Sequence, residues 1–246
     1  MDQHNTGWPD TGGRVAGAPD NGGFEETVRA MRLILEPGQV TELRALGVST
    51  SDYKRPHTVS GYFDDAEALA REAEQLTPYA NGVYFIPNVV NPALLARAEN
   101  RVRPVGQEPL TSDKDIVARR WLLVDIDAKR PSGISSTNSE HDAAITKARQ
   151  IREVLAGKGW PQPILADSGN GAHLMYRIDL PVDDEGLVKR ILEGLSLQFD
   201  DEHSHVDTTV HNPARIWKLY GTLSRKGDDV QDRPHRMARI LEAPDA

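Results

Sequence analysis

The sequence predicts an α+β fold whose core is a split βαβ unit, with the element order β-α-β-β-α-β. Apolar and β-branched runs at 121–127, 163–168, 173–180 and 205–210 are typical of strands, and helical patterns follow the first and the third of them. Between the two middle strands, the Gly-Asn-Gly-Ala stretch at 169–172 is typical of a hairpin turn. In this RRM-like arrangement both helices cover one face of the sheet, so the opposite face is free to carry a functional site.

Two amphipathic helices are expected in this core. The first covers 139–159, where Ser139 would be the N-cap and Asp142 follows three residues later, a variant of the capping box. The second covers 183–199, and its apolar face consists of Leu187, Ile191, Leu192, Leu195 and Phe199. Both helices therefore have one side suited to packing on the sheet.

Composition divides the rest of the chain into a leader and an N-terminal subdomain. Residues 1–23 hold six glycines, two prolines and few large apolar residues, which predicts a disordered leader. Residues 24–119 are expected to form an N-terminal α/β subdomain packed on the core, and 120–246 form the core itself with a basic C-terminal segment. Within the N-terminal subdomain we expect helices at 24–35, 64–76 and the start of 92–119, and strands at 39–46, 61–63 and 81–90.

Composition also excludes several classes of protein. The 246 residues include no cysteine, so disulfides and a zinc-cysteine site are excluded. No apolar run approaches the roughly 20 residues of a membrane-spanning helix. The N-terminal residues lack the features of a signal peptide. These observations predict a cytoplasmic protein without a membrane partner.

Charge is unevenly distributed along the chain. The formal net charge is −8, yet the segment from His211 to Leu241 holds seven Lys or Arg against three Asp. A basic segment on an acidic body fits a localised phosphate-binding face. It fits a solvated, salt-bridged surface equally well, so charge by itself does not decide the function.

Three aspartates are the candidate metal ligands. Side chains alternate along a strand, so Asp125 and Asp127 in VDID point the same way while Val124 and Ile126 point to the core. By itself this short pattern is equally typical of a charged edge strand. Asp207 lies on the fourth predicted strand, next to the first, and three converging carboxylates would suit Mg²⁺ or Mn²⁺. The basic pair Lys129 and Arg130 that follows VDID receives no role from this pattern.

Phosphate-binding groups are expected beside these carboxylates. The glycine-rich turn in SGNGAHL lets backbone amides approach a phosphate, and Ser168 and His173 add two donors. Arg215 and Lys218 follow Asp207 closely and would clamp a triphosphate. Arg225 and Lys226 are weaker candidates for contacts with phosphate or the nucleic-acid backbone.

Together these motifs resemble the archaeo-eukaryotic primase superfamily, in particular the primase-polymerase domains of phages and plasmids. VDID corresponds to its first motif, SGNGAH to its second and HVD to its third, and the basic run ARIWKLYGT follows in the same place. The resemblance covers about 121–226 and extends less definitely to the stretch before it. Each motif is short, but their ordered set on this predicted frame is specific.

The resemblance implies a DNA-dependent primase-polymerase with 120–246 as its catalytic subdomain. Asp125, Asp127 and Asp207 would bind two divalent ions, Mg²⁺ or Mn²⁺. The incoming nucleotide would be held by Ser168, His173, Arg215 and Lys218. The implied partners are a single-stranded DNA template, nucleoside triphosphates, and a replicative helicase that is fused or encoded nearby. The sequence departs from many cellular members, which carry a zinc module, and it contains no helicase motif.

Two other functions remain open. Rolling-circle replication initiators also use a split βαβ sheet, with a His-hydrophobe-His metal pair and a nucleophilic tyrosine. Here His203-Ser204-His205 and Tyr220 imitate that set, although Ser204 is polar and Tyr220 lies in LYGT, an improbable helix interior. A non-catalytic nucleic-acid-binding module would not need the carboxylates and would present aromatic side chains on the open sheet face, where the predicted strands offer few.

Overall fold

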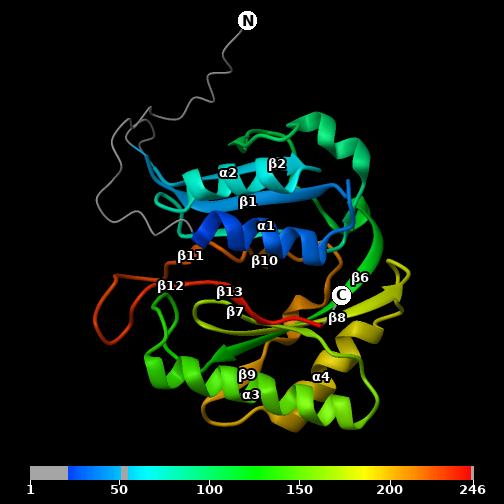
Figure 1. The fold of residues 1–246 in the computed structure, drawn as a ribbon, viewed down its shortest axis with the longest axis vertical. Helices are drawn as coiled ribbons and strands as arrows, with labels where there is room; N and C mark the ends of the chain where they lie inside the picture. Colours follow the sequence, from blue (N-terminus) through cyan, green and yellow to red (C-terminus); the bar gives the residue numbers. More distant parts are fainter. Residues whose placement is uncertain (1–21, 51–54, 245–246) are drawn as a thin grey trace, which may run out of the picture.

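The computed structural model describes residues 22–50 and 55–244. The predicted leader at 1–23 therefore lies outside the described residues, except for Gly22 and Gly23, which begin helix α1 (Gly22–Ile34). The described chain combines helices with antiparallel sheets, which confirms the α+β class (Figure 1). Among the described helices, none is long and apolar enough to cross a membrane.

The first sheet has five strands in the order β10-β3-β1-β2-β5. Its strands are β1 (Thr41–Val48), β2 (His57–Phe63), β3 (Gly82–Phe85), β5 (Arg103–Pro104) and β10 (Trp217–Lys218). Helices α1 and α2 (Ala66–Leu76) lie along this sheet, and the side chain of Asp65 caps α2 by accepting from the amides of Glu67 and Ala68 (Figure 1). Leu43 and Ala45 are buried in the core with both helices, so Arg44 faces the other way.

The second sheet has the strand order β13-β7-β8-β6-β4, and β9 pairs with the end of β6. Its strands are β4 (Val89–Val90), β6 (Ile116–Ala128), β7 (Ile164–Asp167), β8 (Gly171–Leu180), β9 (Ser204–Val206) and β13 (Arg239–Glu242). Helices α3 (Asn138–Gly157) and α4 (Leu187–Phe199) lie together below this sheet in the view of Figure 1, away from the first sheet. The remaining elements are a two-stranded ribbon of β11 (Leu223–Ser224) and β12 (Arg236–Met237) and the short 3₁₀ helices η1 (Pro92–Arg97), η2 (Asp113–Asp115) and η3 (Thr208–His211).

Several predicted boundaries differ from the observed ones. The strand expected at 81–90 is divided between the two sheets as β3 and β4, with Pro87, which lacks an amide hydrogen, between them. The predicted division at 119/120 falls inside β6, which begins at Ile116. The predicted cap Ser139 is wrong: Thr137 caps α3, because its hydroxyl accepts from the amide of Glu140 while the Glu140 carboxylate accepts from the amide of Thr137.

The end of the chain connects the two sheets. After β9 the chain crosses to the first sheet, where Trp217 pairs with Phe85 and Lys218 with Tyr84. It then returns to the second sheet, where β13 pairs with β7. Residues from both sheets therefore meet where β3, β6, β8 and β10 approach one another.

Candidate active site

Three carboxylates converge at the end of β6, as the strand pattern predicts. Val124 and Ile126 are fully buried, so Asp125 and Asp127 between and beside them point to the opposite face. Asp207 directly follows β9, and its amide donates to the Asp125 carbonyl oxygen at 2.8 Å. One carboxylate oxygen from each aspartate lies within 4.8 Å of the other two.

This acidic triad has the properties of a hard-cation site. Burial, followed by the charges of Asp127 and Asp207, raises the pKa of Asp125 well above its ordinary value. Lys226 and Arg130 act in the opposite direction. Because the donors are carboxylate oxygens that repel one another, a bound Mg²⁺ or Mn²⁺ ion would relieve the repulsion. The residues present therefore fit a divalent metal.

The hairpin between β7 and β8 lies tightly against β6. Gly169 has a φ of +89°, and a Cβ there would lie 2.5 Å from the Cβ of Ser224. A Cβ on Gly171 would lie 2.3 Å from the Ile126 carbonyl oxygen, so only glycine permits this approach to β6. The Asp167 carboxylate accepts from the Gly169 amide at 2.7 Å and thereby holds the turn. The same turn presents Ser168 to the site cavity.

His173 lies directly opposite Asp125 in the sheet, with Nε2 at 3.6 Å from a carboxylate oxygen. Its ring stacks on Trp217 with centroids 3.8 Å apart, and Nδ1 lies 2.9 Å from the Tyr220 hydroxyl. Burial, helped by the charge of Lys218, lowers the pKa of His173 to about 3, so the ring is neutral at pH 7. We assign the tautomer from the network: Trp217 Nε1–H donates to the Tyr220 oxygen, and the Tyr220 hydroxyl has two acceptors, His173 Nδ1 at 2.9 Å and the weaker acceptor Met175 Sδ at 3.5 Å, of which we assign Nδ1. This leaves His173 Nε2–H as a donor facing the site.

A cavity of about 260 Å³ opens in front of the triad. It is lined by Leu46, Tyr84, Asp125, Asp127, Ser168, Asn170, His173, Asp207, Val210, Arg215, Ile216, Trp217, Lys218, Ser224 and Lys226. The cavity therefore combines three acidic side chains on one wall with basic and hydrogen-bonding side chains on the others. One guanidinium nitrogen of Arg215 donates to the Thr209 carbonyl, while its Nε has no hydrogen-bond partner among the described residues.

The two lysines of the cavity differ in what they can do. Lys218 is 4% exposed, and its Nζ donates to the Thr222 hydroxyl at 2.7 Å, to the Leu223 carbonyl at 3.1 Å and to the Val83 carbonyl at 3.4 Å. All three protons of its ammonium group are thus engaged within the protein. Burial, with the charge of Arg225, lowers the pKa of Lys218 to about 7. Lys226, in contrast, is an exposed side chain of the cavity wall.

The sequence patterns missed the aromatic side chains of the cavity, and they assigned Arg225 and Lys226 the same role. Arg225 does not line the cavity, because its guanidinium donates to the Pro78 carbonyl. Tyr84 and Trp217 reach the cavity through the pairing of β3 with β10. A sequence pattern carries no sign of this pairing, since its partners are far apart in the chain.

The arrangement of a nicking enzyme is not formed by the described residues. Tyr220 is fully buried, its hydroxyl is hydrogen-bonded, and burial raises the pKa of the phenol. A nucleophile must reach a scissile phosphate, which this side chain cannot do in the folded protein. The His203 side chain is 68% exposed, and neither His203 nor His205 belongs to the group of potential metal ligands found in the described chain.

Comparisons with known proteins give a distant structural likeness. No protein-family model and no curated protein matches the chain. Among solved structures, the polymerase domain of Ligase D from Mycobacterium tuberculosis, in complex with DNA, overlays with a TM-score of 0.46. The two share 17% sequence identity, with 87% of this chain and 79% of that chain covered. Values this low leave function to be judged from the side chains of the cavity.

Proposed function

We propose that this chain is a DNA-directed nucleotidyltransferase of the primase-polymerase type. The observation that carries the proposal is the convergence of Asp125, Asp127 and Asp207 on a cavity whose other walls present hydrogen-bond donors and cations. An acidic cluster that faces basic side chains suits a ligand with both metal ions and phosphates, such as a nucleoside triphosphate.

The side chains of the cavity have distinct tasks in this reaction. The triad would hold two Mg²⁺ or Mn²⁺ ions, which supply charge neutralisation at the attacking and leaving oxygens. Ser168, the Nε2–H of His173, Arg215 and Lys226 would donate to the phosphate oxygens and hold the triphosphate in line with a primer end. Lys218 would contact a phosphate only after release of one of its three present acceptors.

The chemistry is the transfer of a nucleotidyl group. The 3′-hydroxyl oxygen of a primer, or of a first nucleotide, forms a bond to the α-phosphorus. The bond from that phosphorus to the bridging oxygen breaks, pyrophosphate leaves with the electron pair, and the hydroxyl proton passes to solvent. A single-stranded DNA template would select the nucleotide by base pairing, and either ribo- or deoxynucleoside triphosphates are substrates in this proposal.

The sheet order and the sequence motifs support the finer parts of the proposal. The strand order β7-β8-β6-β9, with α3 and α4 on one side of the sheet in Figure 1, supports the proposal of an RRM-like catalytic core. On this reading 24–119 form the N-terminal subdomain and 120–246 the catalytic one, and the two share strands, because β6 begins before the division, β4 joins the second sheet and β10 joins the first. The motif resemblance supports a role in phage or plasmid replication in the cytoplasm, beside a helicase that is fused or encoded nearby.

Synthesis on a single-stranded DNA template tests the proposal. Wild-type protein, labelled nucleotides and Mn²⁺ or Mg²⁺ are expected to give extended primers and newly made primers. The double variant Asp125→Ala, Asp127→Ala should give neither, while Asp179→Asn, in a side chain that is 86% exposed, should match wild type. Absence of product from wild type, or equal product from the double variant, would refute the enzymatic proposal. DNA binding without metal-dependent synthesis would favour a binding module, and a covalent link between protein and a DNA 5′ end would favour nicking.

A further inference from the structure

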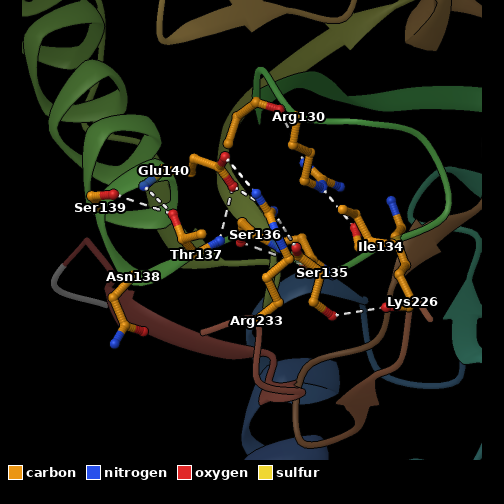
Figure 2. A network of polar contacts seen from close by, with 12 residues as sticks. Arg130, Ile134, Ser135, Ser136, Thr137, Asn138, Ser139, Glu140, Lys226 and Arg233 are labelled. Carbon is orange, nitrogen blue, oxygen red and sulfur yellow. Dashed lines mark hydrogen bonds and ion pairs between the residues drawn. The ribbon is translucent and has the colours of Figure 1, made fainter. Parts of the chain in front are cut away.

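Arg130 ties the end of the metal-binding strand to the loop that follows it. Its side chain is 8% exposed, and Nη1 lies 3.5 Å from an Asp127 carboxylate oxygen. The same nitrogen donates to the Ala128 carbonyl at 3.0 Å, while Nε donates to the Ile134 carbonyl at 3.0 Å. Figure 2 shows the side chain spanning the loop toward Ile134. One guanidinium therefore fixes both ends of the segment 128–134, which we call the β6 loop.

Ser135, the residue that follows the β6 loop, is hydrogen-bonded to the backbone of Lys226. The Ser135 hydroxyl donates to the Lys226 carbonyl at 3.2 Å (Figure 2). A Cβ on Gly227 would lie 3.0 Å from the Gly133 carbonyl oxygen, so the backbone beside Lys226 lies directly against the loop. Arg233 donates to the Ser135 carbonyl at 2.8 Å and also pairs with Glu140, which anchors the same stretch to the start of α3. The contacts thus run from Asp127 through Arg130 to Ile134, and from Ser135, the next residue in the chain, to the backbone of Lys226.

We propose that Arg130 is a positioning residue that sets the place of Lys226 relative to the metal-binding carboxylates. The inference rests on the proposed function, because it gives Lys226 the task of binding the triphosphate whose metal ions Asp127 holds. The two groups come from distant parts of the sequence and must act on one ligand. The β6 loop is the described connection that contacts both of them.

Charge alone gives the opposite expectation for Arg130. A fixed cation beside a metal-binding carboxylate repels the metal, so a purely electrostatic role means that its removal tightens metal binding. The three contacts of the guanidinium indicate a geometric role instead. Lysine cannot replace it, because a single ammonium group cannot reach acceptors at both the Nε and the Nη1 positions.

The experiment measures binding rather than turnover. Arg130→Gln, Arg130→Lys, Lys226→Gln and the double variant Arg130→Gln, Lys226→Gln are compared with wild type. Mn²⁺ binding is followed by electron paramagnetic resonance of the free ion, and binding of a non-hydrolysable deoxynucleoside triphosphate by calorimetry with Mn²⁺ saturating. Arg97→Gln is the matched control, because Arg97 also donates to a backbone carbonyl, that of Pro109 at 3.1 Å, and does not line the cavity.

We expect both Arg130 variants to weaken triphosphate binding about tenfold, as Lys226→Gln does. The double variant should be within about twofold of Lys226→Gln, since Arg130 acts through Lys226 and the two changes are not additive. Arg97→Gln should leave triphosphate binding unchanged. Additive losses, an Arg130→Lys variant equal to wild type, or tighter Mn²⁺ binding with unchanged triphosphate binding in Arg130→Gln would overturn the inference.

A second variant covers the case in which the Arg130 substitutions unfold the protein. Ser135→Ala removes the hydroxyl that holds the Lys226 carbonyl and leaves Arg130 in place. It should weaken triphosphate binding severalfold in a protein that remains folded by circular dichroism, and unaltered binding would contradict the inference. If wild type binds neither Mn²⁺ nor the triphosphate, the proposed function fails as well. Failure of the inference alone leaves wild-type binding intact, so the two results differ.

Discussion

The backbone amide of Asp207 donates a 2.8 Å hydrogen bond to the carbonyl oxygen of Asp125. This single backbone contact places the carboxylate after β9 beside the pair in β6. It brings like charges together, and with burial they raise the pKa of Asp125 well above its ordinary value. The charges that suit the three carboxylates to a metal ion therefore lower the stability of the metal-free protein.

Neutralising one carboxylate should stabilise the metal-free protein. Asp125→Asn keeps the size of the side chain and removes its charge, so we expect the free energy of unfolding in EDTA at pH 8 to rise. Excess Mn²⁺ should raise the melting temperature of wild type, because ligand binding stabilises the folded state, and should affect the variant little. Thermal unfolding with EDTA and with Mn²⁺ measures both effects. A variant less stable than wild type in EDTA would contradict the prediction.

Lys218 and Lys226 should fail in different ways. Lys218→Met removes the donor to the Thr222 hydroxyl and to the Leu223 carbonyl, whereas the Val83 carbonyl keeps the amide of Leu219. We expect a loss of about 1–3 kcal/mol in the free energy of unfolding. Lys226→Ala should leave that free energy unchanged and raise the KM for nucleoside triphosphate about tenfold. Urea unfolding and steady-state kinetics of both variants separate the roles. Equal effects on KM at equal stability would show that Lys218 also contacts substrate.

Tyr220 is predicted to be a structural residue. Tyr220→Phe removes the hydroxyl that accepts from Trp217 Nε1 at 3.0 Å and bonds His173 Nδ1, so these buried groups lose their partner. We expect a loss of about 1–3 kcal/mol in the free energy of unfolding. Denaturing electrophoresis of wild type with labelled single-stranded DNA should show no covalent adduct. An adduct that disappears in Tyr220→Phe would restore the nicking hypothesis.

Glu72 should make stability depend on pH far from the active site. This α2 side chain is 8% exposed, its Oε2 has no hydrogen-bond partner among the described residues, and burial raises its pKa to about 7. An unfolded glutamate ionises from about pH 4.5, whereas the folded one keeps its proton to about pH 7, so stability is lost as the pH rises through this window. Glu72→Gln stays neutral and should be more stable than wild type by about 2 kcal/mol at pH 8.

Urea unfolding at pH 4.5 and pH 8 measures this difference. The advantage of Glu72→Gln should be small at pH 4.5, where the folded wild-type side chain is protonated and the unfolded one is only half ionised. Glu74→Gln, in an exposed position of the same helix, should follow wild type at both pH values. An equal advantage of Glu72→Gln at the two pH values would show that ionisation is not its cause.

The elements with strong periodicity were predictable from sequence. The alternation through VDID correctly separates the buried Val124 and Ile126 from the two aspartates, because a strand permits only this distribution of side chains. At the start of α2 the sequence allows either Asp64 or Asp65 as N-cap, and the bonds from the amides of Glu67 and Ala68 assign the cap to Asp65. The α3 cap was misplaced because several residues near its start can serve as caps, and the reciprocal bonds between Thr137 and Glu140 choose among them.

The sequence by itself determined the chemistry available to this protein: three aspartates, a glycine-rich turn with Ser168 and His173, and a basic segment. The tertiary structure alone decided which cation faces the cavity. Pairing of β10 with β3 buries Lys218 among three acceptors, while Ser135 and Gly133 contact the backbone at Lys226 and Gly227 and leave the Lys226 side chain exposed at the cavity. Those choices depend on contacts between segments distant in the chain, and the free energy of such contacts leaves no periodic pattern in the sequence.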